Sequence, residues 1–380
     1  MEITVEELQK LNKDSYVLYD IRDSLERSYG YIPDSVSIAP EEIESRHAES
    51  NSKSAVIYCA RGVVSLDIAK SLCEKGIKAY SLKDGYISWL RYEMNRQNAD
   101  IVCQSAERSL HKKFKKNIFG KFIKALKTYR LVNEGDKIAV CISGGKDSFL
   151  MAKLFQELKL HSPVNFDVEY IVMDPGYNAE NRNIIEQNAK MLKIPIKIFE
   201  SNIFESVYTV EKSPCYLCAR MRRGYLYSFA KSLGCNKIAL GHHYDDVIET
   251  ILMGMLHGAQ IQTMMPKLHS TNFEGMELIR PLYFVREDDI KAWRDFNGLH
   301  FIQCACKFTD TCTTCNNGEN HSKRQETKEL IRALKKSNPD VEKCIFKSVE
   351  NVNVDTVIAY KQNGVRHNFL DDYDIDKNKN

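Results

Sequence analysis

Residues 137–148 read Lys-Ile-Ala-Val-Cys-Ile-Ser-Gly-Gly-Lys-Asp-Ser. The mostly apolar run Lys137–Ile142 predicts a short buried strand, and the apolar spacing of Phe149–Leu158 predicts a helix directly after it. Between them, Gly144 and Gly145 permit a tight turn that brings backbone N–H groups close to an anion. The N-terminus of the helix adds a partial positive charge at the same place. The stretch therefore predicts a strand–loop–helix unit that binds a phosphate group.

The charged residues of this loop suit a nucleotide with its metal ion. Lys146 can neutralise a phosphate, and Asp147 is suited to hold Mg²⁺ and to act in catalysis. The stretch does not match the Walker A pattern; it resembles the SGGxDS loop of the PP-loop ATP pyrophosphatases. This resemblance implies cleavage of ATP between its α- and β-phosphates and adenylation of a carbonyl oxygen. The nucleotide-binding residues would then be Ser143, Gly144, Gly145, Lys146, Asp147 and Ser148, the alternative being a turn that is merely rich in glycine.

A second polar cluster follows the predicted strand Lys237–Leu240 and opens the predicted helix Val247–Leu256. Ligands of open α/β sheets bind at the carboxyl ends of the strands, so we expect this cluster to face the nucleotide. Two neighbouring carboxylates could take a Mg²⁺–pyrophosphate, although an Asp at a helix start is often only a cap. The candidates are His242, His243, Asp245 and Asp246, with Asp174, at the end of another predicted strand, as a further nucleotide contact.

Predicted strands alternate with helical patterns from Lys137 onward, which favours an α/β fold with a parallel sheet covered on both faces. The strands are expected at 137–142, 168–173, 196–199, 237–240 and 278–279. A separate compact α/β pattern occupies the first hundred residues. We therefore expect domains at 1–100, 101–136 (basic helices), 137–300 and 301–380 (a Cys-rich and helical region with a disordered polar tail).

Three motifs near the N-terminus resemble a single rhodanese-like domain: Asp20–Arg22, Gly30–Val36 and Cys59–Ser65. A cysteine in a strand–helix loop, ringed by backbone N–H groups, has a stabilised thiolate and can carry a persulfide. Cys59 is the predicted catalytic sulfur carrier, with a buried structural cysteine as the alternative. Rhodanese loops often place Arg where this chain has Val64. We therefore expect a persulfide donor protein, such as a cysteine desulfurase, rather than thiosulfate.

The cysteine pair Cys215-Tyr-Leu-Cys218 is by itself ambiguous between zinc, iron–sulfur and redox chemistry. Together with the motif at 238–247 and the runs Pro266–Leu268 and Arg280–Ile290, it resembles the tRNA 2-thiocytidine synthetases, from about Lys112 to about Asp372. That family implies tRNA as the substrate, thiolation of the 2-thiocytidine type and an oxygen-sensitive [4Fe–4S] cluster.

The resemblance implies Cys215, Cys218 and Cys304 as the ligands of this cluster. The chain departs from the family pattern nearby, because Cys304-Ala-Cys306 is followed by Cys312-Thr-Thr-Cys315. Cys306 therefore stays open as the third ligand, and a second site, for zinc, is an alternative.

Residues 107–130 hold nine Lys or Arg and one acidic residue, Glu107. Apolar residues interleave with them at helical spacing, which predicts basic amphipathic helices that contact RNA phosphates, a solvated helix face being the alternative.

The composition as a whole favours a cytoplasmic enzyme. Its 380 residues carry a net charge of +3 and 12 cysteines, and no long apolar run predicts a membrane span. Two rival functions stay open, a PP-loop sulfurtransferase acting on another base, a small molecule or a carrier protein, and a rhodanese-like domain that only docks or regulates. The target nucleotide is not predicted, and a homodimer is an open alternative.

Overall fold

The computed structural model describes residues 1–48, 53–96, 98–201, 214–302, 323–371 and 373. It divides into two compact units. Unit 1 comprises Met1–Tyr244 and Pro266–Asn316, and unit 2 comprises Asp245–Met265 and Asn317–Asn380. Within the described ranges, none of the helices combines the length and the apolar character that a membrane crossing requires.

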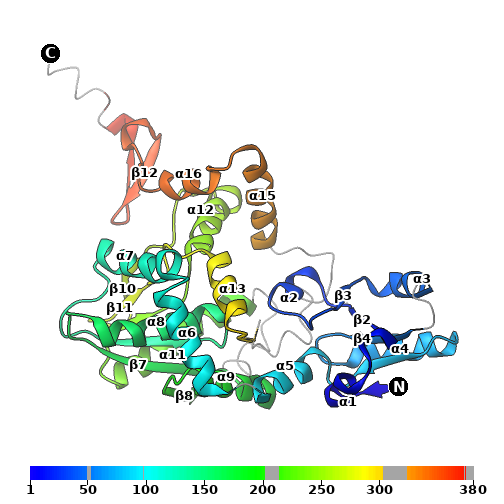
Figure 1. Ribbon diagram of the computed structural model, residues 1–380. Coiled ribbons are helices and arrows are strands. Elements are labelled where there is room, and N and C mark those ends of the chain that lie inside the picture. The colour runs from blue at the N-terminus through cyan, green and yellow to red at the C-terminus, as the bar shows by residue number, and fades with distance from the viewer. Residues whose placement is uncertain (49–52, 97, 202–213, 303–322, 372, 374–380) are drawn as a thin grey trace. The chain divides into compact units, whose positions relative to one another are not determined.

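The N-terminal part of unit 1 is a five-stranded parallel sheet with the strand order β1-β5-β4-β2-β3 (Figure 1). Its strands are β1 (Glu2–Ile3), β2 (Tyr16–Asp20), β3 (Val36–Ser37), β4 (Ser54–Tyr58) and β5 (Ala79–Leu82). Its helices are α1 (Val5–Lys10), α2 (Ser24–Ser28), α3 (Ile43–Ala48), α4 (Val63–Glu74) and α5 (Gly85–Arg96). Thr4 and Glu7 form the capping box of α1, in which each side chain accepts a hydrogen bond from the other's backbone N–H. The predicted rhodanese-like α/β pattern is confirmed.

The second sheet has the order β10-β11-β9-β6-β7-β8 and is parallel except at its edge strand β10. Its strands are β6 (Lys137–Ile142), β7 (Asp167–Asp174), β8 (Ile196–Glu200), β9 (Lys237–Ala239), β10 (Lys267–His269) and β11 (Glu277–Ile279). The five predicted strands are all present, and the antiparallel β10 was not predicted. The parallel α/β fold of this region is confirmed.

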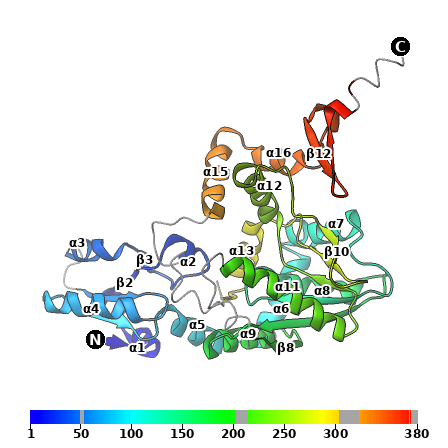
Figure 2. The same cartoon turned by 180° about the vertical axis from the view of Figure 1, so that it is seen from behind.

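Helices cover both faces of this sheet. Successive side chains along its buried strands point to opposite faces and pack into two different apolar clusters. Ile138 and Val140 pack into the cluster of α8 (Lys146–His161) and α9 (Ala179–Met191), whereas Ala139 and Cys141 pack into that of α11 (Pro214–Ser232). Figure 2 shows α11 along the sheet when the protein is seen from behind. Burial on both faces explains why these strands are continuously apolar.

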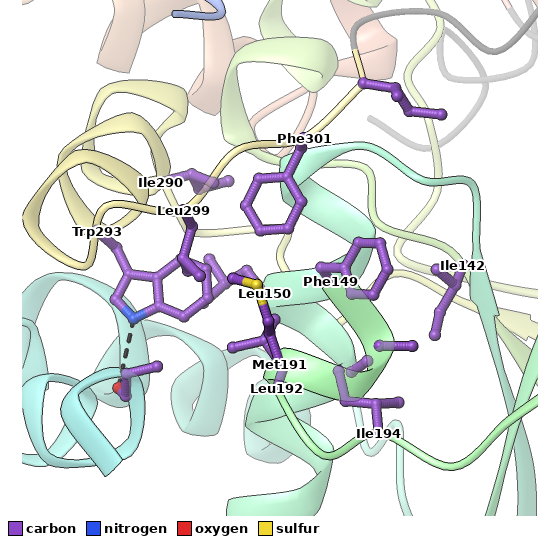
Figure 3. Packing of buried hydrophobic residues seen from close by; sticks show 14 of the residues in the cluster. Ile142, Phe149, Leu150, Met191, Leu192, Ile194, Ile290, Trp293, Leu299 and Phe301 are labelled. Carbon is purple, nitrogen blue, oxygen red and sulfur yellow. Dashed lines mark hydrogen bonds between the residues drawn. The ribbon is translucent and has the colours of Figure 1, made fainter. Parts of the chain in front are cut away.

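Helix α8 lies in the centre of the larger cluster. Phe149 on α8 stacks on Phe301, with ring centroids 5.3 Å apart, and the indole N–H of Trp293 donates to the carbonyl of Ala106 at 3.5 Å (Figure 3). Trp293 belongs to α13 (Glu287–Phe296). The same apolar cluster continues through α5 into the N-terminal sheet, so one face of each sheet of unit 1 packs into a shared cluster, while the opposite faces have clusters of their own.

The basic segment 107–130 is helical and amphipathic, as predicted. It spans the end of α6 (Ala99–His111), a π-helical turn (Lys115–Phe119) and α7 (Gly120–Thr128). Its buried apolar residues are Leu110, Phe114, Ile118, Phe122, Ala125 and Leu126, and its exposed basic residues are Arg108, Lys112, Lys113, Lys115, Lys116, Lys124, Lys127 and Arg130. Lys121 is half-buried and pairs with Asp289 at 3.3 Å.

Unit 2 is mainly helical, with a small hairpin near its C-terminal end. Its elements are α12 (Tyr244–Gly258, which begins in unit 1), α15 (Lys323–Ser337), α16 (Val341–Ser348), β12 (Ala359–Gln362) and β13 (Val365–Asn368). The hairpin was not predicted, since its sequence is polar. The last residues of the predicted disordered tail, 374–380, lie outside the described residues.

Candidate active site at the phosphate loop

The phosphate loop joins β6 to α8, as the sequence predicts. Gly145 is the N-cap of α8, and the Ser148 hydroxyl donates to the Gly145 carbonyl at 2.9 Å while accepting the Ser143 N–H at 3.1 Å. Gly144 has a φ of 91°, and a Cβ there would lie 2.5 Å from Cδ1 of Ile302. The backbone conformation and the packing both require glycine at 144. The loop is therefore held in one shape by its own side chains and its apolar neighbours.

Lys146 is the buried cation of this loop, with an exposed fraction of 3%. Its Nζ lies 3.2 Å from the Asp147 carboxylate and 3.1 Å from that of Glu287, the first residue of α13. Burial alone would lower the pKa of Lys146, but the two carboxylates raise it above its usual value. Lys146 is therefore a fixed positive charge at the loop. Sequence reasoning missed Glu287 as its partner, because only the fold brings residue 287 to residue 146.

Asp147 and His243 meet beside the lysine. The Nε2 of His243, which is 5% exposed, lies 3.9 Å from Oδ1 of Asp147. That Oδ1 is buried and has no hydrogen-bond partner among the residues that the structure describes. A carboxylate oxygen left in this way suits a hard cation such as Mg²⁺. The donor set of the loop therefore fits a nucleotide with its metal ion.

The remaining predicted residues of the sheet edge differ in what surrounds them. Asp174 ends β7, and its Oδ1 accepts the N–H groups of Gly176 and Tyr177 at 2.8 and 2.6 Å. Its Oδ2 lies 3.3 Å from Arg182, so this buried carboxylate orders the loop that follows the strand. His242 lies next to His243 and is partly buried.

Asp245 and Asp246 open α12 and belong to unit 2. Within that unit, Asp246 pairs with Arg324 of α15 at 3.4 Å, and Arg324 also reaches Glu249 at 3.2 Å. The sequence predicted that these two carboxylates take a Mg²⁺–pyrophosphate, and within unit 2 the structure adds Arg324, which partly offsets their charge.

The predicted cluster ligands are only partly within the described structure. The backbone of α11 begins at Pro214, so Cys215 and Cys218 occupy its first turn, three residues apart. Cys304, Cys306, Cys312 and Cys315 lie outside the described residues. Ile302, which packs on the phosphate loop, is two residues before Cys304 in the sequence.

Cys59 lies in a similar loop of the N-terminal sheet, between β4 and α4. Its Sγ accepts the Gly62 N–H at 3.1 Å and lies 3.4 Å from the Ser65 hydroxyl. Gly62 is the N-cap of α4 with a φ of 84°. Val64, where rhodanese loops often carry Arg, is 55% exposed. The thiol therefore lies at a helix N-terminus, where one backbone N–H donates to it and one hydroxyl lies nearby.

The N-terminal sheet region also contacts the surroundings of the phosphate loop. The Tyr29 ring centroid lies 5.3 Å from Nζ of Lys146, and Arg294 donates to the Ser28 carbonyl at 3.1 Å. Trp89 packs edge-on against His300, with centroids 5.3 Å apart. Burial and the nearby Arg294 lower the pKa of His300 to about 4. These contacts between distant parts of the sequence were not predicted.

Comparisons with known proteins match two successive parts of the chain to two domain families. A rhodanese-like domain model matches residues 4–92, and a PP-loop domain model matches residues 110–309. The tRNA-cytidine(32) 2-sulfurtransferase of Aliivibrio fischeri is 36% identical over 249 residues, which cover 64% of this chain and 76% of the relative. The enzyme of the same name from Vibrio parahaemolyticus is 34% identical over 247 residues, 64% and 78% of the two chains.

Among solved structures, the chain is similar to the U34-tRNA thiolase NcsA from Methanococcus maripaludis, which was solved with its [4Fe–4S] cluster. The identity is 23% and the TM-score 0.48, with 61% of this chain and 76% of that chain covered.

Proposed function

Because this chain belongs to the PP-loop domain family and is a tRNA-cytidine 2-sulfurtransferase-like enzyme, we propose that it replaces the C2 oxygen of a tRNA cytidine with sulfur at the expense of ATP. The observation that carries the proposal is the phosphate loop, in which buried Lys146 lies at the start of α8 beside an Asp147 oxygen that accepts no hydrogen bond from the described residues. In this reaction the base oxygen attacks the α-phosphate, pyrophosphate leaves, and sulfur then displaces AMP.

The loop residues Ser143–Ser148 would hold the pyrophosphate part of ATP. Backbone N–H groups at the N-terminus of α8 and the charge of Lys146 favour an anion, and Asp147 would hold Mg²⁺. His242, His243, Asp245 and Asp246 would complete the site, and Asp174 would shape the loop that contacts the nucleotide. An ordered, charged loop lowers the barrier chiefly by stabilising the negative charge that develops on the phosphates.

The tRNA would be held by its phosphates, with the target base splayed from a loop. The exposed lysines of the basic segment support this, since Lys112, Lys115 and Lys116 extend into solvent above a buried apolar stripe. Replacing these lysines with Glu should lower the affinity for tRNA whatever the tRNA sequence. The affinity should also change less with salt concentration than that of the wild type. Unchanged binding would favour a small molecule or a carrier protein as the substrate.

An iron–sulfur cluster would be held by Cys215, Cys218 and Cys304, with Cys306 as the other candidate for the third ligand. When bound, such a cluster supplies iron that binds sulfur. Three thiolates on a four-iron cluster leave one iron without a protein ligand. An iron of this kind could bind the sulfur atom that a sulfur-transfer enzyme delivers. Protein purified without oxygen should contain about four irons per chain, and stoichiometric zinc without iron would refute the assignment.

The rhodanese-like region would carry the sulfur as a persulfide on Cys59, received from a cysteine desulfurase. Two equivalents of a thiol reductant would release this sulfur as sulfide, which restores the Cys59 thiol and leaves the reductant as its disulfide. The neutral donors around Sγ, from Gly62 and Ser65, support a sulfur anion without binding it as tightly as a charged partner would.

The experiment that tests the proposed function uses Asp147→Asn, which keeps the shape of the side chain and removes its charge. With a tRNA transcript, ATP and sulfide, the wild-type chain should release one pyrophosphate for each thiolated base, and the variant should lose both activities. Asp167→Asn is the matched control. Asp167 is exposed at the N-terminal end of β7, at the edge of the parallel sheet remote from the phosphate loop, and its only ion pair among the described residues is with Lys159. Release of ADP and phosphate by the wild type would refute the proposed reaction.

A further inference from the structure

His111, Glu157 and His161 converge at the end of α8 opposite to the phosphate loop. One ligand atom from each residue lies within 4.8 Å of the other two. Glu157 and His161 are four residues apart on α8, so they project from the same face of the helix. His111 is the last residue of α6, which brings the third side chain from another element. None of the three has a role in the site described above.

The geometry of the cluster centres on the buried carboxylate of Glu157, which is 4% exposed. His111 Nε2 lies 2.6 Å from Oε2 of Glu157, and the His111 ring also packs on Phe119 at 4.9 Å. The His161 ring stands edge-on to that of His111, at 5.6 Å and 90°. A buried carboxylate is costly unless a positive charge is next to it. The exposed His161 leaves the cluster open to solvent on one side.

We propose that these three residues bind a zinc-type divalent cation. Two imidazoles and one carboxylate form a donor set that zinc accepts, with water in the fourth position, whereas Mg²⁺ and Ca²⁺ prefer oxygen ligands alone. Ligand atoms at about 2.0–2.2 Å from a tetrahedral ion are about 3.3 Å apart. The hydrogen bond between His111 and Glu157 would therefore lengthen, and the exposed His161 would turn inward, with changes confined to side chains.

The ion would tie the C-terminal end of α8 to the end of α6. Helix α8 begins at the phosphate loop, and α6 ends where the basic segment turns at Lys112. The role that this position supports is structural, because the ion fixes the start of the basic segment relative to the helix that carries Lys146. Its removal should therefore lower stability and RNA affinity more than the rate of pyrophosphate release.

The test measures binding of Zn²⁺ to metal-free full-length protein by competition with a coloured chelator, followed by X-ray absorption at the zinc edge. The chain has twelve cysteines, so both measurements are repeated in a six-cysteine variant, in which Cys215, Cys218, Cys304, Cys306, Cys312 and Cys315 are all replaced by alanine. We expect one zinc with only nitrogen and oxygen neighbours at about 2.0–2.1 Å. His161→Ala should weaken this binding about a hundredfold or more, while it keeps the pair of His111 and Glu157 that supports the fold.

His257→Ala is the matched control, since His257 is exposed on α12 and distant in sequence from the cluster. It should bind zinc as the wild type does. Glu157→Gln should also weaken binding, because it removes the negative ligand and keeps a hydrogen-bonding group beside His111. Equal affinity of His161→Ala and the unsubstituted protein, sulfur neighbours of the zinc bound by the six-cysteine variant, or no zinc bound by that variant would each overturn the proposal.

Discussion

Two loops of this protein use the same backbone arrangement for different chemistry. The Cys59 loop and the phosphate loop each follow a central parallel strand, contain a left-handed glycine (Gly62 and Gly144) and lead into a helix. Around the thiol of Cys59 the described contacts come from neutral donors. The phosphate loop instead holds a buried lysine between two carboxylates. A backbone that favours anions is thus adapted by its side chains, to one sulfur atom in the first case and to a metal-bound polyphosphate in the second.

The largest expected effect comes from removing the charge that distinguishes the phosphate loop. Lys146→Gln should reduce tRNA-dependent pyrophosphate release by about 10²–10³-fold, because it removes a fixed donor to the leaving group. Lys159→Gln, at the exposed far end of α8, should leave the rate unchanged. The measurement is pyrophosphate release under saturating tRNA, and a Lys146 variant with the wild-type rate would show that the two loops do not differ in this way.

A second test concerns how each region holds its buried charges. In the phosphate loop, the buried ion pairs are those of Lys146, within the proposed nucleotide site. In the N-terminal sheet, the buried ion pairs are those of Asp20, which is fully buried. The Asp20 carboxylate accepts hydrogen bonds from Arg22, Arg27 and Tyr58 at 2.7–2.9 Å. Asp20→Asn should lower the free energy of unfolding by about 3 kcal/mol, since it leaves two guanidinium groups without their counter-charge.

Urea unfolding followed by circular dichroism measures this change, with the exposed Asp14→Asn as the control. If both variants unfold at the wild-type midpoint, the buried network around Asp20 does not stabilise the fold.

The sequence predicted what depends on neighbours along the chain. The strand β6, the turn at Gly144 and the start of α8 follow from apolar runs and two glycines. It did not predict the partners that the fold brings from afar, such as Glu287 and Tyr29 beside Lys146. The antiparallel β10 was missed because three residues at an edge have little pattern.

The contact between Trp89 and His300 joins the two regions and makes their stability depend on pH. Burial lowers the pKa of His300 to about 4, below the ordinary value near 6.5. Between about pH 6.5 and pH 4, His300 is therefore protonated in the unfolded chain and neutral in the folded chain. Stability is unaffected above about pH 6.5 and falls as the pH decreases toward 4. Between about pH 7.5 and pH 5 the loss should be about 2 kcal/mol.

His300→Phe keeps an aromatic ring beside Trp89 and cannot be protonated. The stability of wild type and variant should therefore diverge as the pH falls, with the wild type losing more. Urea midpoints across this range measure the divergence. Parallel curves would mean that His300 is not buried against Trp89 in solution.

The smallest effect tests the difference between the two loops most directly. It should appear in sulfur delivery and not in pyrophosphate release. Cys59→Ala removes the sulfur carrier and leaves Lys146 and Asp147 untouched, so tRNA-dependent pyrophosphate release should be unchanged. With a cysteine desulfurase and cysteine as the sulfur source, thiolation should fall about tenfold or more, since a tethered donor acts at an effective concentration on the order of millimolar. Excess inorganic sulfide does not need a carrier, so it should restore the wild-type rate. Cys73→Ala, a half-buried cysteine of the same region whose thiol donates to the Ala79 carbonyl, is the control and should behave as wild type with both donors. A Cys59 variant that thiolates normally with the desulfurase would place the N-terminal region outside the sulfur path, and its resemblance to the phosphate loop would then be one of backbone alone.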